Sequence, residues 1–301
     1  MSQQKIILIA GPTAAGKSAL ALDLARKNRG TIINADAMQI YAGLPVLSAQ
    51  PPAEERQEIP HELYGVLDPA EASSAGKWLG LATAAIERTV AAGRIPILVG
   101  GTGLYFRALL GGLADIPPIP DTVRAETQAM YDALGEEKFR ATLATIDPAS
   151  AARLARNDRQ RLIRAYEVAA HTGKALGEWH EKGRLEAGGW KLAVKLSPAS
   201  GLQPLASEPH LILPPREELY AACDARFRQM IGRGAVEEVR AFLQRNLAPT
   251  LPAMKTIGVR EIGAYLQGES TLDDAIAKAQ QATRNYAKRQ MTWFRNQGLG
   301  A

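Results

Sequence analysis

Residues 11–18 have the types and spacing needed to bind phosphate. They read Gly-Pro-Thr-Ala-Ala-Gly-Lys-Ser and fit the pattern G-x-x-x-x-G-K-[ST] at every fixed position. Backbone N–H groups of such a loop and of the following helix N-terminus converge on a phosphate group. Lys17 would add a positive charge, and the Ser18 hydroxyl would be a ligand for Mg²⁺. The stretch predicts a site for a diphosphate or triphosphate, whether cleaved for energy or used as a reactant.

A carboxylate follows the second apolar run of the chain. Asp36 comes directly after residues 31–35, which are rich in isoleucine. Ligands of open α/β sheets bind beyond the carboxyl ends of the strands, so Asp36 should face the same crevice as the loop. There it could hold Mg²⁺, orient a nucleophile or accept a proton. Equally, it could only cap the turn that follows.

The third apolar run, residues 95–99, ends in Gly100-Gly101-Thr102-Gly103. Enzymes that couple a phosphate loop to energy use typically carry an Asp for Mg²⁺ at such a strand end. The absence of such an Asp argues against a motor protein or a nucleotide-dependent switch protein. Small residues here would admit a bulky substrate, and the Thr102 hydroxyl could donate and accept hydrogen bonds. The alternative is a glycine-rich turn in which Thr102 caps the next helix.

The surrounding pattern predicts the elements that would position these groups. Short apolar runs at residues 5–10, 31–35 and 95–99 are typical of buried parallel strands, and further strand-like runs lie at 192–196 and 210–213. The proline-rich stretch 115–120 marks a change in composition, after which residues 121–182 read as helical. We therefore expect an α/β fold: a P-loop core with a parallel sheet, residues 1–115 and 192–301, plus a helical insertion, residues 116–191.

Composition excludes several classes. The 301 residues are 46% hydrophobic, which excludes a disordered chain, and no apolar run approaches the roughly 20 residues of a membrane span. A single cysteine excludes an internal disulfide and a cysteine-cluster metal site, and the four histidines lack ligand spacing. The chain runs directly into its first strand, so we expect no signal peptide and a cytoplasmic location.

Two segments are strongly basic. Residues 153–164 hold five arginines and one acid, with Arg153, Arg156, Gln160 and Arg164 at helical spacing. Near the C-terminus, basic and aromatic side chains alternate: Arg284, Tyr286, Lys288, Arg289, Trp293, Phe294 and Arg295. Guanidinium groups pair with phosphates and aromatic rings stack on bases, so these segments favour nucleic-acid binding over a merely solvated helix face.

Seven motifs in one order give the chain a family resemblance. They are GPTAAGKS, NADAMQIY, LVGGTGLY, NDRQRLIRAYEV, REELYAACDARFRQMI, MKTIGVREI and RNYAKRQMTWFRN. From about residue 6 to residue 296 the chain resembles bacterial tRNA dimethylallyltransferases, the tRNA isopentenyltransferase family. The resemblance implies Mg²⁺ and a helical insertion that grips the anticodon stem-loop of tRNA. It also implies transfer of a dimethylallyl group from its diphosphate to the exocyclic amine of the adenosine 3′ of the anticodon, with release of pyrophosphate. We expect a monomer.

The resemblance also implies roles for individual residues. Asp36 would take the proton from the adenine amine, and Thr102 would hold that amine by a hydrogen bond. The donor diphosphate would contact Gly11, Pro12, Thr13, Ala14, Ala15, Gly16, Lys17, Ser18 and Arg216, with Mg²⁺ on Ser18. The tRNA would contact Asp36, Ala37, Met38, Gln39, Thr102, Arg124, Gln160, Arg161, Leu162, Ile163, Arg164, Lys255, Thr256, Ile257, Gly258, Val259 and Arg260.

Some positions depart from the family pattern, and other functions stay open. Ala37 stands where serine is common, Ala42 where a basic residue is usual, and Ser48 and Gln50 replace threonine and lysine. We expect these changes to affect contacts near residues 37–50 and not the core reaction. Alternatives are an adenylate prenyltransferase, a small-molecule kinase and a non-catalytic RNA-binding ATPase. The arginine-rich insertion and basic C-terminal segment argue against the first, because a mononucleotide needs neither.

Overall fold

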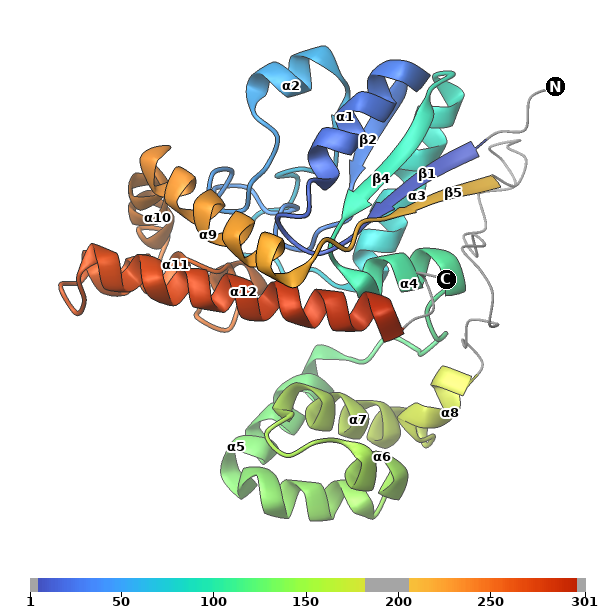
Figure 1. Ribbon diagram of the computed structural model, residues 1–301. Coiled ribbons are helices and arrows are strands. Elements are labelled where there is room, and N and C mark those ends of the chain that lie inside the picture. Colours follow the sequence, from blue (N-terminus) through green and yellow to red (C-terminus); the bar gives the residue numbers. More distant parts are fainter. Residues whose placement is uncertain (1–4, 182–205, 297–301) are drawn as a thin grey trace. The chain divides into compact units, whose positions relative to one another are not determined.

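A five-stranded parallel sheet forms the centre of the larger unit (Figure 1). The computed structural model describes residues 5–181 and 206–296. The strands are β1 (Lys5–Ala10), β2 (Gly30–Asn34), β3 (His61–Glu62), β4 (Ile95–Gly100) and β5 (Ala206–Leu211), in the order β3-β2-β4-β1-β5. All four neighbouring pairs are parallel, so the carboxyl ends of the strands meet at one edge. The predicted parallel sheet is confirmed.

Burial on both faces explains why the strands are continuous apolar runs. Residues 6–10 of β1 are fully buried. Alternate side chains, among them Ile7, Ile9 and Ile97, pack against Ala21 and Ala25 of α1 (Lys17–Asn28). The intervening side chains face away from α1, on a sheet that α3 (Ala75–Ala91) also contacts at β2 and β4.

The strands predicted at 5–10, 31–35 and 95–99 are present within one residue of those bounds. The last strand is displaced: β5 spans Ala206–Leu211, earlier than the predicted 210–213. Its sequence Ala-Ser-Glu-Pro-His-Leu is polar because the strand lies at the sheet edge, so hydrophobicity does not mark it. Two-residue β3 is too short for a periodic signal. The run at 192–196 lies outside the described residues.

Helices complete this unit. They are α2 (Ala53–Glu58), α4 (Gly103–Gly111), α9 (Arg216–Gly232), α10 (Ala235–Leu243), the 3-10 helix η2 (Pro252–Lys255), α11 (Val259–Leu266) and α12 (Leu272–Asn296). The long helix α12 packs along α9 and α11. It buries two glutamines, Gln280 and Gln290, on the same face as Ala279, Ala287 and Phe294.

The helical unit has its own core. It contains α5 (Asp121–Ala144), α6 (Pro148–Arg153), α7 (Arg159–Thr172) and α8 (Leu176–Glu181). Phe139 is fully buried there and contacts the rings of Tyr131 and Tyr166. Buried Asp147 accepts hydrogen bonds from the N–H groups of Ser150 and Leu176, which joins the starts of α6 and α8.

Contacts divide the chain into two compact units, Met1–Leu110 with Ala187–Ala301, and Gly111–Glu186. These ranges lie within a few residues of the predicted core and insertion, whose assigned roles stay predictions. No helix in the described ranges is long and apolar enough to cross a membrane.

The expected single basic helix over residues 153–164 is wrong. Helix α6 ends at Arg153 and α7 begins at Arg159. Between them Asn157 adopts a left-handed conformation, with φ of 64°, and its N–H donates to Glu136. The Asp158 carboxylate then accepts from the N–H of Arg161 and starts α7. Arg153 and Arg156 therefore do not share a helix face with Gln160 and Arg164.

Candidate active site

The loop predicted to bind phosphate connects β1 to α1 at the carboxyl edge of the sheet. Helix α1 begins at Lys17, and Gly16 before it has φ of 85°, in the left-handed region. The Lys17 ammonium donates to the Pro12 carbonyl at 2.6 Å, which places its charge over the loop. Burial lowers the pKa of Lys17 to about 8, while the charge of Asp36 opposes that shift. An anion bound beside Lys17 would stabilise the charged form of this buried ammonium.

A second cation reaches the loop from α9. The Arg226 guanidinium donates to the Thr13 hydroxyl. Burial lowers the pKa of Arg226, and Asp36 again opposes the shift. Beneath the loop, Ala14 and Ala15 pack on buried Cys223 and Met291. Two cations beside a loop that packs against α9 and α12 could bind a polyanion such as a diphosphate.

Arg216, the cation assigned by the resemblance, lies elsewhere on the same helix. It is exposed at the first residue of α9, and its guanidinium lies over the Tyr220 ring at 5.0 Å. Ten residues of helix separate it from Arg226, about 15 Å along the axis. The structure brings Arg226 to the loop where the sequence prediction named Arg216.

Asp36 lies beyond the end of β2 and is held by its neighbours. Its N–H donates to the Asn34 side chain at 2.8 Å, and the Asn34 amide donates to its carbonyl at 2.9 Å. Oxygen Oδ1 accepts from the Met38 N–H at 2.9 Å. One oxygen thus caps a turn, as the structural alternative predicted. In the part of the chain that is described, no hydrogen bond to the other oxygen is found.

Thr102 lies beside Asp36. Its hydroxyl accepts from the Ala37 N–H at 2.9 Å, and its own N–H donates to the Ala35 carbonyl at 3.3 Å. Burial, followed by the charge of Asp36, raises the pKa of the Tyr286 phenol on α12, while the nearby Thr102 side chain opposes that shift. Thr102 and Asp36 therefore share one small polar site at the ends of β2 and β4.

The glycines around Thr102 have a different role from the one predicted. We expected the small residues to admit a substrate, but α12 fills the space beside them. A Cβ at Gly101 would overlap the amide nitrogen of Gln290, and a Cβ at Gly103 would overlap the Trp293 ring. These glycines allow α12 to approach the strand end closely.

Ser18 fits the role predicted for Mg²⁺. It is exposed in the first turn of α1, next to Lys17. Within the described ranges, no group of three or more His, Cys, Asp or Glu side chains could hold a metal ion. Mg²⁺ keeps several waters and binds to few protein groups together with substrate phosphates, so at Ser18 it would need a bound diphosphate to complete its ligands.

Two segments predicted to contact tRNA lie together in the core unit. The hydroxyl oxygen of buried Thr256 donates to the Ala253 carbonyl and lies 3.5 Å from Met38 Sδ, and this contact joins segments 36–39 and 255–260. Lys255 and Arg260 are exposed at either end of the second segment. Gly258, with φ of 102°, packs against Leu47, and Val259 is buried, so these two support the surface.

Ser48 and Gln50, two of the departures, take part in hydrogen bonds within their loop. The Gln50 amide donates to the Tyr41 carbonyl at 2.8 Å and to the Ser48 hydroxyl at 3.2 Å. The Gln39 amide donates to the Ser48 and Ala49 carbonyls at 3.0 and 2.7 Å. Gln39, which is predicted to contact tRNA, therefore also stabilises the loop at residues 48–50.

In the helical unit the predicted contacts differ in exposure. Arg124, Gln160 and Arg161 are exposed, and Arg124 lies 3.9 Å from Asp121. Arg164 pairs with Glu167 at 3.4 Å. Leu162 and Ile163 are buried in the core of the unit, so only their backbone atoms could contribute to a direct contact.

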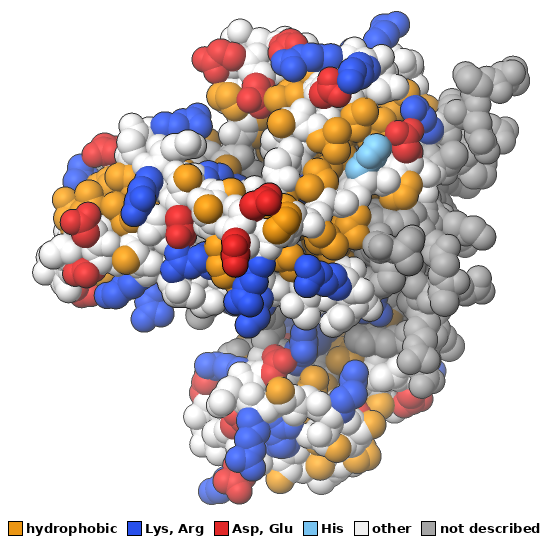
Figure 2. Space-filling model, in the orientation of Figure 1, with side chains coloured by type: hydrophobic (Ala, Val, Ile, Leu, Met, Phe, Trp, Pro, Cys, Tyr) orange, Lys and Arg blue, Asp and Glu red, His pale blue; other side chains and the backbone are white. Residues whose placement is uncertain are grey.

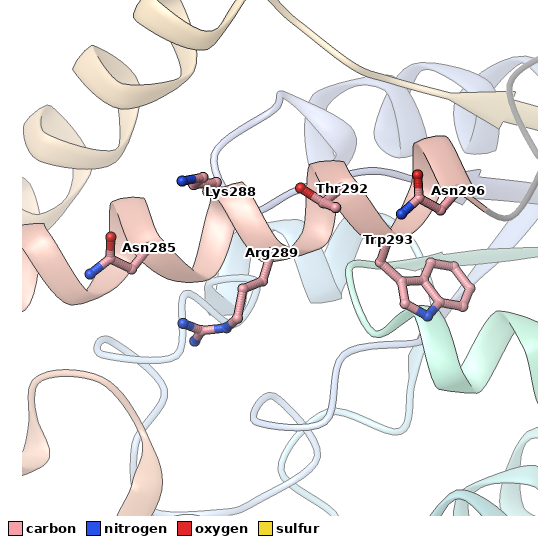
Figure 3. A pocket seen from close by; sticks show the side chains of 6 residues that line it. All are labelled: Asn285, Lys288, Arg289, Thr292, Trp293 and Asn296. Atoms are coloured by element: carbon pink, nitrogen blue, oxygen red, sulfur yellow. The ribbon is translucent and has the colours of Figure 1, made fainter. Parts of the chain in front are cut away.

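A shallow basic hollow lies along α12 (Figure 3). It has a volume of about 470 Å³ and is lined by Asn285, Lys288, Arg289, Thr292, Trp293 and Asn296, which share one helix face. In Figure 2, Lys and Arg side chains line this edge of the core unit. Of the other members of the predicted basic segment, Arg284 pairs with Asp224 at 2.6 Å and Phe294 is buried.

Sequence reasoning did not single out Arg226 or Gln290, and it noted Tyr286 only as one of the aromatics in the basic segment. Arg226 follows Cys223 by three residues and so points to the same side of α9. Helical spacing from that buried face could have identified Arg226. Nothing in the local pattern marks Gln290 as different from Gln280.

Related proteins match almost the whole length of the chain. The sequence model of the family described as IPP transferase matches residues 39–297, and that described as isopentenyl transferase matches residues 4–64. A tRNA dimethylallyltransferase of Caulobacter sp. (strain K31) is 52% identical over 99% of this chain and 91% of that protein. One of Rhodospirillum centenum is 53% identical over 97% of this chain and 88% of that protein.

Solved structures show the same fold. A eukaryotic dimethylallyltransferase acting on tRNA superposes with a TM-score of 0.79 at 28% identity, covering 97% of this chain and 70% of that one. The tRNA isopentenylpyrophosphate transferase of Bacillus halodurans superposes with a TM-score of 0.64 at 32% identity, covering 98% of this chain and 88% of that one. A phosphate loop with two cations, a carboxylate at the neighbouring strand end and these full-length similarities place the chain in the IPP transferase family.

Proposed function

We propose that this chain transfers a dimethylallyl group from dimethylallyl diphosphate to the exocyclic amine of the tRNA adenosine immediately 3′ of the anticodon. The observation that carries this proposal is the arrangement at one sheet edge. The side chains of Lys17 and Arg226 both donate to the phosphate loop, while Asp36 and Thr102 lie at the ends of β2 and β4. The names of the relatives, tRNA dimethylallyltransferases, supply tRNA and the dimethylallyl group. The diphosphate donor and the adenosine amine as acceptor are what the family resemblance implies.

The residues suggest a direct displacement. The amine nitrogen attacks C1 of the dimethylallyl group as the bond from C1 to the diphosphate oxygen breaks, and pyrophosphate leaves with the electron pair. Lys17, Arg226 and loop N–H groups stabilise the negative charge that develops on the leaving group. Mg²⁺ held by Ser18 would neutralise further charge on the diphosphate. The two cations beside the loop would stabilise a departing pyrophosphate as well as they would bind the phosphates of a nucleotide.

The acceptor side uses the Asp36 and Thr102 pair. A neutral aromatic amine is a poor nucleophile, so a carboxylate that accepts its proton speeds the attack. The free oxygen of Asp36 is available for that proton, and Thr102 would fix the amine nitrogen. The adenosine must leave its stack to reach this site, which costs a few kcal/mol.

Exposed basic residues on both units would supply binding energy for tRNA. In the core unit these are Lys255, Arg260 and the hollow with Lys288 and Arg289; in the helical unit they include Arg161. Phosphate contacts by such side chains release counterions and make binding dependent on salt. A free mononucleotide as acceptor would need neither surface.

One experiment separates the candidate functions. The protein is incubated with Mg²⁺, dimethylallyl diphosphate and unmodified tRNA, and the tRNA is digested to nucleosides for mass spectrometry. A prenylated adenosine supports the proposal. Prenylation of free adenylate alone would indicate an adenylate prenyltransferase, phosphoryl transfer from ATP a kinase, and ATP binding without either product a non-catalytic RNA-binding ATPase.

A further inference from the structure

Gln290 is a buried side chain that connects two parts of the site far apart in the sequence. It lies on α12 and is 5% exposed. Its carbonyl oxygen accepts from the Thr13 N–H in the phosphate loop at 2.8 Å. Its amide nitrogen donates to the Gly101 carbonyl at 2.8 Å, next to Thr102. One side chain thus joins the loop that would hold the donor to the strand end that would hold the acceptor.

The chemistry of this bridge requires a primary amide. Among side chains of this length, only glutamine offers both a neutral carbonyl acceptor and an N–H donor on one terminal group. Glutamate could still accept from Thr13 but, when ionised, could not donate to Gly101. Methionine would fill the space and leave both backbone groups without a partner.

The surroundings leave Gln290 little freedom. The bridge exists because Gly101 has no Cβ, since that atom would overlap the Gln290 amide. One turn further along α12, the Trp293 ring occupies the matching space beside Gly103. These two contacts flank Thr102 on either side. Movement of Gln290 would therefore shift Thr13 and Thr102 relative to each other.

We propose that Gln290 is a positioning residue that holds the phosphate loop and the Thr102 strand end at the separation required for in-line attack. Displacement reactions are sensitive to this distance, and a misplacement of about 1 Å can cost about a hundredfold in rate. Because it concerns the prenyl-transfer step, this inference rests on the proposed function.

The chain offers a matched control on the same helix. Gln280 is 6% exposed, and its amide donates to the Asp224 carbonyl of α9 at 2.9 Å. Ten residues of helix, about 15 Å along the axis, separate it from Gln290. The same substitution, Gln280→Met, therefore removes a buried hydrogen bond of α12 without breaking the bridge.

The test measures steady-state kinetics and donor binding for Gln290→Met, Gln280→Met and Gln290→Glu, at a temperature at which circular dichroism shows each variant folded. We expect Gln290→Met to lower kcat at least about tenfold and to weaken dimethylallyl diphosphate binding in calorimetry, with the KM for tRNA within about threefold. Gln280→Met should lower Tm while leaving kcat and both KM values near the wild-type values. For Gln290→Glu, kcat relative to wild type should recover as the pH falls and the glutamate gains a proton to donate.

Results of three kinds would overturn the role of Gln290. They are wild-type kinetics in folded Gln290→Met, an equal loss of kcat in Gln280→Met, or a Gln290→Glu defect that does not change with pH. If Gln290→Met fails to fold, Gln290→Glu alone decides through its pH profile. If the wild-type protein transfers no prenyl group, it is the proposed function that fails.

Discussion

At the scale of single residues, the site depends on charges kept partly away from water. Burial lowers the pKa of both Lys17 and Arg226, the charge of Asp36 opposes both shifts, and the two cations are the partners available to a diphosphate. In the proposed reaction Asp36 has a double task, because one oxygen holds the turn and the other would take the proton of the amine. Each charge can be tested by a substitution that keeps its packing.

Replacing Asp36 by asparagine should separate catalysis from structure. The amide in Asp36→Asn can still accept from the Met38 N–H, but it cannot take a proton from the adenine amine. We expect kcat to fall by at least about tenfold, as is typical when a general base is lost, with little change in tRNA affinity. Single-turnover rates and tRNA binding measure the two effects, and an unchanged rate would remove Asp36 as the base.

The lowered pKa of Lys17 predicts how donor binding depends on pH. Only the protonated ammonium attracts the diphosphate, and in the free protein its pKa is about 8. Donor affinity should therefore be constant below that pH and fall above it, by up to about tenfold per pH unit. Calorimetric titration with dimethylallyl diphosphate across pH 6 to 10 measures this. In Lys17→Arg the guanidinium does not titrate, so the break should disappear; a break at the same pH would assign it to another group.

Arg226 and Arg216 provide a comparison on a single helix. Arg226→Gln should weaken donor binding by about 10- to 100-fold, because it removes a charged contact from the loop. Arg216→Gln should change it by less than about threefold, since Arg216 lies exposed over Tyr220. Equilibrium binding of dimethylallyl diphosphate gives both values. The reverse order would restore Arg216 as the diphosphate contact.

At the scale of elements, helices α7 and α12 bring basic residues to the surface in different ways. On α12 the hollow residues occupy one face while the opposite face is buried. On α7 buried Leu162 and Ile163 anchor the helix, and Arg161 beside them is exposed. In both helices, the residues that contact the core hold the exposed cations in place.

Neutralising two arginines of α7 tests its contribution. Arg161→Gln with Arg164→Gln should weaken tRNA binding and reduce the slope of log affinity against log salt by about 0.7–0.9 for each lost phosphate contact. Filter binding over a range of salt concentrations measures the slope. Arg233→Gln, an exposed arginine of the core unit, is the control. If the slope stays the same, α7 is only a solvated basic face.

At the scale of the whole molecule, the chain forms two units with separate cores, and the proposed function assigns them different tasks. The residues of the proposed donor site lie in the unit with the sheet, and the arginine-rich α7 lies in the helical unit. Because each unit buries its own hydrophobic side chains, damage to one core should leave the other folded.

Phe139→Ala tests this division. It removes a fully buried ring of the helical unit and should destabilise that unit by about 3–5 kcal/mol. We expect a lower unfolding transition for the helical unit in calorimetry and weaker tRNA binding, while dimethylallyl diphosphate still binds with wild-type affinity. If donor binding falls together with tRNA binding, the two units do not act independently.

The sequence by itself determined the features that depend on neighbouring residues. The loop at 11–18, the strands that flank it and the positions of Asp36 and Thr102 follow from local patterns, because a strand end and a helix start are set by a few consecutive residues. The family resemblance rests on the same contiguous motifs.

Only the tertiary structure decided which distant groups meet. Thr13 and Gln290 are 277 residues apart in the chain, and Thr13 and Arg226 are 213 apart. Their contacts depend on how α9 and α12 pack, and a single sequence does not encode that packing in any local period. For the same reason the glycines around Thr102, which suggested space for a substrate, proved to be the places where α12 approaches the strand end.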